Sequence, residues 1–197
     1  MKLLIISLLL LNGLLSAQPI NLRDTSNKYD YIIITRPWLV DDCNTFKEHK
    51  ESFNQFRVLV VTVEDILTQF KDSSFYPYDI REFISYAGKY WASPKPKFIL
   101  LAGDRDMIPN WNVADSLDII KDLYGSDFYY SQSLYDPDTI KVDFYVGRVP
   151  ARTSTSLNNY FNKVVSYEIS QPYSWQNKSL ILSDGVFIQL LQMITQV

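Results

Sequence analysis

The stretch KFILLAG, residues 97–103, decides the fold of this chain. It is a short apolar run that ends in glycine, a pattern typical of a strand buried on both faces of a parallel sheet. Three comparable runs surround it, YIIIT at 31–35, RVLVVTV at 57–63 and VDFYVGR at 142–148, and SLILS at 179–183 is a fifth candidate. We therefore expect a sheet whose strands are widely separated along the chain.

Helices are predicted in the intervals between these strands. Asp41 or Asp42 can cap the first, a short helix is expected over 63–70, and Asp79 and Thr153 can cap two more. The capped helices carry apolar residues at helical spacing: Phe46, Phe53 and Phe56 with the stem of Lys50; Ile80, Phe83, Ile84, Ala87, Tyr90 and Trp91; and Leu157, Tyr160, Phe161, Val164 and Tyr167.

This alternation of strands and helices predicts an α/β fold with a parallel sheet covered by helices on both faces, a three-layer arrangement. The stretch 104–141 is acidic and rich in aromatic residues, so we expect an ordered, elaborate loop there. With 197 residues, of which 47% are apolar, the chain is sufficient for one globular unit. Its formal net charge of -3 argues against nucleic acid as a partner.

The N-terminus has the order of a secretory signal peptide. Lys2 precedes an apolar run over 3–15, and the small residues Ser16 and Ala17 follow. A membrane anchor is the competing interpretation, but a bilayer span needs ~20 apolar residues and this run is shorter. We expect a signal peptide over 1–17, export to the periplasm, the cell surface or the medium, and no membrane span after cleavage.

Cys43 and His49 are the only cysteine and the only histidine of the sequence. On one helix, six residues apart, they would lie about 120° apart around the axis and about 9 Å along it. General-base activation of a thiol needs an approach of about 2.6–3.2 Å, so no dyad is expected from this pair. Cys43 could instead be a nucleophile with another partner, pair with another chain, or be a small buried apolar residue.

Other catalytic and metal-binding motifs are absent from the sequence. It contains no GxSxG nucleophile elbow, no phosphate-binding GxxxxGK loop and no HExxH zinc motif. Carboxylates could supply oxygen ligands for calcium, although solvated caps and turns are favoured; they are Asp104, Asp106, Asp115, Asp118, Asp122, Asp127, Asp136, Asp138 and Asp143. No catalytic or cofactor-binding residue is therefore assigned, and metal ligands are left open.

Three parts of the chain, taken in order, resemble the gingipain family of secreted cysteine peptidases, peptidase family C25. They are LLAGDRDMIP at 100–109, SDFYY at 126–130, and DFYVGRVPARTSTSL at 143–157 running into NKVVSYE at 162–168. The family pattern is a strand ending in Gly-Asp with a nearby Ile-Pro, a Ser/Thr-Asp-x-x-Tyr segment, and a strand ending in Gly-Arg-x-Pro before a helix. The resemblance spans about 29–184.

This resemblance implies a caspase-like fold, export from a bacterium of the Bacteroidetes kind, and proteolysis by a cysteine with a histidine partner. The family's histidine and cysteine follow the strand that 179–183 resembles, and neither Cys43 nor His49 lies at a matching position. We therefore expect residues 29–185 to be the N-terminal portion of a peptidase domain, incomplete at its C-terminus and inactive alone. Residues 186–197 depart from the pattern, for which a frameshift or an early stop is one explanation.

Several matching residues have predicted structural roles. Gly103 and Asp104 are expected to end a strand tightly, and Asp127 to hold the aromatic loop by Asx-type hydrogen bonds. Gly147 and Arg148 are expected to act similarly at the next strand end, with Arg148 pairing a buried carboxylate.

Two functions follow. The first is a gingipain-type cysteine endopeptidase, or the related sortase-like peptidase of type IX secretion, acting on protein or peptide substrates. The second is a non-catalytic exported binding or scaffolding module, for which the aromatic residues Phe128, Tyr129, Tyr130 and Tyr135 are the candidate contacts.

Overall fold

The computed structural model describes residues 20–71, 76–113, 124–135 and 141–170. The expected signal peptide over 1–17, the strand over 179–183 and the tail over 186–197 lie outside these residues. The chain divides into two compact units at Lys163 and Val164. The second unit contributes only the end of one helix to the described residues, so the elements of the sheet all belong to the first.

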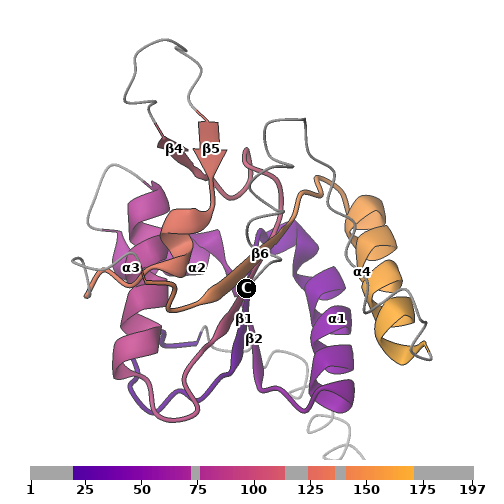
Figure 1. The fold of residues 1–197 in the computed structure, drawn as a ribbon, viewed down its shortest axis with the longest axis horizontal. Helices are drawn as coiled ribbons and strands as arrows, with labels where there is room; N and C mark the ends of the chain where they lie inside the picture. Colours follow the sequence, from indigo (N-terminus) through magenta and orange to yellow (C-terminus); the bar gives the residue numbers. More distant parts are fainter. Residues whose placement is uncertain (1–19, 72–75, 114–123, 136–140, 171–197) are drawn as a thin grey trace, which may run out of the picture. The chain divides into compact units, whose positions relative to one another are not determined.

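The central sheet of the first unit has four parallel strands in the order β2-β1-β3-β6 (Figure 1). They are β1 (Tyr31–Thr35), β2 (Val58–Thr62), β3 (Phe98–Ala102) and β6 (Tyr145–Val149). The strands β1, β2 and β3 lie within apolar runs singled out in the sequence, whereas β6 begins three residues into the predicted run 142–148 and ends one residue beyond it. The predicted parallel α/β sheet is confirmed. Four of the five residues of each of β1, β2 and β3 are buried, which explains the continuous apolar character of these strands.

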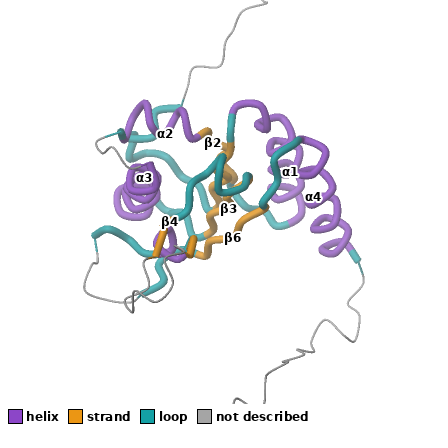
Figure 2. The backbone as a smooth tube through the Cα atoms, turned by 90° about the horizontal axis from the view of Figure 1, so that it is seen from above, coloured by secondary structure: helices purple, strands orange, loops and turns teal. Residues whose placement is uncertain are grey.

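Helices cover both faces of this sheet, as Figures 1 and 2 show. On one face lie α2 (Val63–Phe70) and α3 (Tyr76–Tyr90); on the other lies α1 (Val40–Phe53), preceded by the 3-10 turn η1 (Pro37–Leu39). The helix α4 (Ser154–Ile169) begins in the first unit.

The beginning of α4 packs beside α1. The rings of Phe46 and Phe161 stack at a centroid distance of 4.1 Å. The carboxylate of Asp42 accepts hydrogen bonds from Ser154 and Asn158 at 2.8 and 2.7 Å. These contacts hold the beginnings of the two helices together on the α1 side of the sheet.

The residues at which the helices begin differ in part from the sequence prediction. Neither Asp41 nor Asp42 caps α1: Leu39 is the N-cap, and both aspartates lie in the first turn, where they still favour the helix dipole. Asp79 does not cap α3 either, because the helix begins three residues earlier, at Tyr76. The Thr153 cap is confirmed, since its hydroxyl accepts the N–H of Ser156 at 3.2 Å.

The predicted apolar faces are correct near their centres and wrong at their edges. Phe83, Leu157 and the other residues at the centres of the predicted faces are buried. Tyr90 and Tyr160, at the edges, are 44% and 45% exposed. Phe56 follows α1 instead of belonging to it. Tyrosine at the margin of a helix face can keep its hydroxyl in water while its ring covers apolar surface, so spacing alone overestimates its burial.

The stretch 104–141 contains more regular structure than a loop. A short antiparallel pair, β4 (Trp111–Val113) with β5 (Tyr124–Ser126), precedes the 3-10 turn η2 (Phe128–Ser131). Within the part of the chain that the structure describes, no helix has the length and apolar character that crossing a membrane requires.

Candidate functional site

The carboxyl ends of β3 and β6 carry the most extensive polar network of the described residues. At the end of β3, the N–H of Gly103 donates to the carbonyl of Val149 at 3.0 Å. A side chain at Gly103 would bring its Cβ within 3.3 Å of the Met107 Cβ and of Ile108. The Oδ1 atom of Asp104 accepts the N–H groups of Asp106 and Met107 at 3.0 and 3.2 Å. The predicted tight end of this strand is confirmed.

Arg152 joins this strand end, a role that the sequence analysis did not assign. Its guanidinium bonds to the carboxylates of Asp104 and Asp106. Burial by itself raises the pKa of Asp104, but Arg152 and the N–H donors of Asp106 and Met107 outweigh that effect and hold the pKa below its ordinary value. The sequence signal was the second arginine in GRVPAR at 147–152, but spacing alone did not reveal its partners.

Arg148 is the centre of the network. Its Nε and Nη2 atoms donate to the two carboxylate oxygens of Asp127 at 2.8 and 2.7 Å, a bidentate pair. Its Nη1 atom donates to the carbonyls of Gly103 and Ile108, both at 2.9 Å. One guanidinium therefore ties β6 to the segment after β3 and to the start of η2.

These contacts confirm that Arg148 pairs with a carboxylate, although the Asp127 side chain is half-buried instead of buried. They also correct two neighbouring predictions. The carboxylate of Asp127 binds Arg148 instead of forming the expected Asx turn. Gly147 does not make a tight strand end, because a Cβ there would meet no atom within 4 Å. It lies inside β6, on the exposed side of the strand.

Tyr130 closes the network from the η2 side. Its ring is fully buried, and its hydroxyl donates to the carbonyl of Pro109. Burial raises the pKa of Tyr130. This tyrosine, one of the four aromatic residues considered for contact with a partner, is therefore part of the core, whereas Phe128 and Tyr135 are 44% and 41% exposed.

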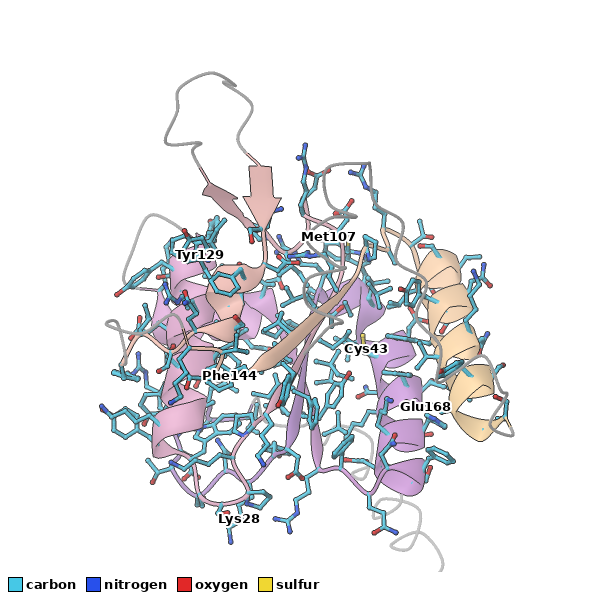
Figure 3. The ribbon with its side chains drawn as sticks, viewed as in Figure 1. Lys28, Cys43, Met107, Tyr129, Phe144 and Glu168 are labelled. Atoms are coloured by element: carbon cyan, nitrogen blue, oxygen red, sulfur yellow. The ribbon has the colours of Figure 1, made fainter. Side chains whose placement is uncertain are left out.

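Cys43 is placed away from water, on the inner side of α1. Its side chain is fully buried. Burial raises the pKa of the thiol to about 12, a shift that the nearby Asp42 charge reinforces and the Thr35 hydroxyl opposes. A cysteine nucleophile reacts as the thiolate, so this environment suits a buried apolar residue. Figure 3 shows Cys43 between α1 and the sheet.

His49 lies on the same helix and stacks on aromatic neighbours. Its ring centroid is 5.3 Å from that of Phe53 and 6.4 Å from that of Phe46. The shared helix and the six-residue separation are those assumed in the geometric argument against a dyad with Cys43.

The described carboxylates of the 104–141 region and its flank are engaged with protein groups. Asp104, Asp106 and Asp127 bind arginines, and Asp143 accepts the N–H of Ser133 at 3.0 Å and pairs with Lys141. Within the described ranges, no cluster of three or more His, Cys, Asp or Glu side chains is arranged to hold a metal ion. The other calcium candidates, Asp115, Asp118, Asp122, Asp136 and Asp138, lie outside the described residues.

Comparison with protein families gives a match to the model of peptidase family C25 over residues 24–196. No curated protein matches the chain. Among solved structures, the chain is similar to dimeric latent PorU from Porphyromonas gingivalis, with a TM-score of 0.58 and 19% identity over 71% of this chain and 15% of that one.

Two further solved structures are similar. The complex of the pro- and mature domains of RgpB from the same organism gives a TM-score of 0.56 and 19% identity over 70% of this chain and 29% of that one. The Arg-specific cysteine proteinase gingipain R gives 0.55 and 18% identity over 70% and 28%. These likenesses show the gingipain caspase-like fold, and the chain spans less than a third of the length of each structure.

Proposed function

The chain belongs to peptidase family C25, and from this membership we propose that it is the N-terminal portion of a gingipain-type cysteine endopeptidase domain, acting on protein or peptide substrates. The family match, which covers residues 24–196, carries the proposal. In this function the described residues form the scaffold of the domain, and the nucleophile and its histidine come from residues further along the domain.

The network at the carboxyl ends of β3 and β6 supports a scaffolding role. Parallel sheets present their working loops at this end. Here Arg148 fixes the segment after β3 against η2 through Asp127 and two carbonyls. Such a connection gives later catalytic loops a rigid base, as precise positioning of reacting groups requires.

Export is part of the same proposal. The apolar run over 3–15 and the small residues Ser16 and Ala17 support a cleaved signal peptide. The product would then be periplasmic, bound to the cell surface or extracellular, and type IX secretion is the proposed route. Sequencing the N-terminus of the protein recovered from its producing cells tests this: a mature start at Gln18 is expected, and retention of residues 1–17 would contradict it.

A second candidate function is a non-catalytic binding or scaffolding module. The burial of Cys43 and the raised pKa of its thiol favour it, because the sole cysteine of the sequence is then unsuited to catalysis. Phe128 and Tyr135 remain exposed candidates for contact, whereas Tyr130 does not.

Peptidase activity of the purified chain, beside a Cys43→Ala variant, is the decisive measurement. The assay uses a mixed fluorogenic peptide library and a reductant, and calcium is added because the sequence leaves metal ligands open. We expect no turnover from either protein. Turnover that Cys43→Ala abolishes would mean that Cys43 is the nucleophile and would overturn the assignment of that role to later residues.

The reading frame beyond the codon of Val197 separates the two candidate functions. The endopeptidase proposal expects a histidine next to a glycine, followed by a cysteine, within a few strand-helix units in one of the three phases. A gene that encodes neither residue would leave the non-catalytic module as the better account.

A further inference from the structure

A groove with a volume of about 1000 Å³ lies at the amino ends of β3 and β6. Lys97 and Phe98 begin its β3 side, Tyr145 its β6 side, and the last turn of α3 closes it at Gly88 and Lys89. Figure 3 places Phe144, which lines the groove, well away from Met107 at the carboxyl end of the sheet. The groove is therefore separate from the Arg148 network.

The floor of the groove is aromatic. The rings of Phe98 and Tyr145 stack at 5.5 Å, and Phe56 lies 5.2 Å from Phe98. Phe144 is buried behind them against Gly88, where an added Cβ would come within 2.5 Å of its ring. Tyr145 is 66% exposed, so the groove offers an accessible apolar surface next to the buried ring of Phe144.

The described residues at the rim of the groove carry more positive than negative charge. They include four lysines, Lys89, Lys95, Lys97 and Lys141, against the two aspartates Asp30 and Asp143. Both carboxylates are engaged: Asp30 accepts the N–H of Arg57 at 3.1 Å, and Asp143 binds Ser133 and Lys141. We call this feature the lysine groove.

The remaining lysines have no carboxylate partner among the described residues. Lys95 donates to the carbonyl of Lys89, and the ammonium of Lys89 lies 4.1 Å from the centroid of the Tyr135 ring. Lys97 is exposed at the start of β3. Within the described part of the chain, whose formal net charge over the full sequence is -3, this aromatic groove thus gathers several lysines that form no ion pair with a described carboxylate, which favours an anionic partner.

The chemistry of the rim indicates carboxylates as the anions in preference to phosphates. None of the described residues that line the groove is an arginine, so they do not supply the bidentate fork that suits phosphate. The helix end that faces it is the C-terminus of α3, which presents carbonyls instead of the N–H groups that bind phosphate. Dispersed ammonium groups around aromatic rings suit a peptide that carries both acidic and apolar side chains.

We propose that the lysine groove binds an acidic peptide segment, with its carboxylates at Lys95 and Lys97 and an apolar side chain against Phe98 and Tyr145. The segment belongs to a protein partner or substrate held at the amino end of the sheet. This inference goes beyond the peptidase proposal and does not depend on it, because binding needs no catalytic residue.

Fluorescence anisotropy of the purified chain with labelled peptides tests the proposal. The probe alternates glutamate and phenylalanine, and the comparison peptides replace glutamate by glutamine or phenylalanine by serine. We expect saturable binding of the probe that weakens as salt is added, and weaker binding of both comparison peptides.

Two groove variants and one control variant locate the site. Lys95→Gln/Lys97→Gln is expected to weaken binding about tenfold at low salt, and Tyr145→Ser to weaken it without removing its salt dependence. The control Lys71→Gln/Lys163→Gln makes the same charge change at exposed positions that do not line the groove and is expected to bind as the unchanged chain does.

Three outcomes would overturn the proposal. They are no binding of the acidic probe, equal losses in the groove and control variants, and tighter binding of a single-stranded oligonucleotide than of the peptide. Circular dichroism of each variant confirms that it is folded, and the two lysine positions of the groove are exposed, so their substitution is not expected to unfold the chain.

Discussion

The two ends of the central sheet differ in whether their charged side chains are paired. At the carboxyl end, Arg148 and Arg152 are matched to aspartates and carbonyls, and Arg148 is largely buried with its partner. At the amino end, the lysines among the described residues outnumber the aspartates around an open aromatic groove. Paired, partly buried charges fix a structure, whereas exposed cations without partners contribute little to stability and remain available for binding. The carboxyl end is therefore the structural end of the described sheet, and the amino end is open to a partner.

Arg148→Met should have the largest effect on stability, and it tests directly whether the two ends of the sheet differ in their contribution to stability. It leaves the Asp127 carboxylate and the carbonyls of Gly103 and Ile108 without their shared donor. We expect a loss of about 2–3 kcal/mol in the free energy of unfolding. The matched variant Lys97→Met, at the open end, should change it by less than about 0.5 kcal/mol. Urea denaturation measures both.

A double variant makes this prediction specific. If the cost of Arg148→Met comes from its partner, adding Asp127→Leu should cost much less than the sum of the two single changes. Additive losses, or a similar loss from Lys97→Met, would break the distinction between the two ends.

The sequence predicted the Arg148 contact only in part, and the reason is physical. An arginine at the end of a buried strand needs an acceptor, so a carboxylate partner could be expected. Asp127, however, lies 21 residues earlier, at the N-cap of η2, and the pair forms only when the segment after β3 folds back over the sheet. Arg152 with Asp104 was missed for the same reason, since 48 residues separate them.

Local patterns predicted the remaining elements to different degrees. The strands β1, β2 and β3 follow directly from short apolar runs, and the predicted helix over 63–70 is α2, whose start the structure shows to be fixed by a capping box between Thr62 and Asp65. The starts of α1 and α3 were wrong because η1 feeds directly into α1 and because Tyr76–Tyr78 extend α3 ahead of Asp79. The lysine groove could not be predicted, because its residues come from segments that meet only in the folded sheet.

A pair of glycine substitutions should have the next largest effect. At Gly88→Ala, beside the groove, the new Cβ would lie 2.5 Å from the buried Phe144 ring. The overpacking should outweigh the gain in helix propensity and lower the free energy of unfolding by about 1–2 kcal/mol. At Gly147→Ala, in the middle of β6, no atom lies within 4 Å of the new Cβ, and stability should stay the same or rise slightly.

The double variant Gly88→Ala/Phe144→Leu checks the cause of that loss. A smaller side chain at 144 should absorb the added methyl, so that the two changes together cost less than their sum. If Gly147→Ala proves the more harmful of the two glycine changes, the exposed side of β6 has less room for a side chain than the absence of atoms within 4 Å of Gly147 indicates.

The smallest expected effect is the acid dependence of the Arg152 pair. Because the folded-state pKa of Asp104 is lowered, its carboxylate stabilises the fold above its unfolded pKa, near 3.8, and this contribution is lost as the pH falls below that value. Arg152 is 68% exposed, so solvent screens the pair, and the hydrogen bonds from Asp106 and Met107 remain in its absence. Arg152→Gln should therefore reduce, without abolishing, the fall in the free energy of unfolding between pH 5 and about pH 2. Urea denaturation at a series of pH values measures this fall. In 0.5 M salt, the free energies of unfolding of the variant and the unchanged chain should differ less. An acid dependence unaltered in Arg152→Gln would mean that the backbone donors alone set the pKa of Asp104, and that charge pairing at the carboxyl end depends on Arg148 alone.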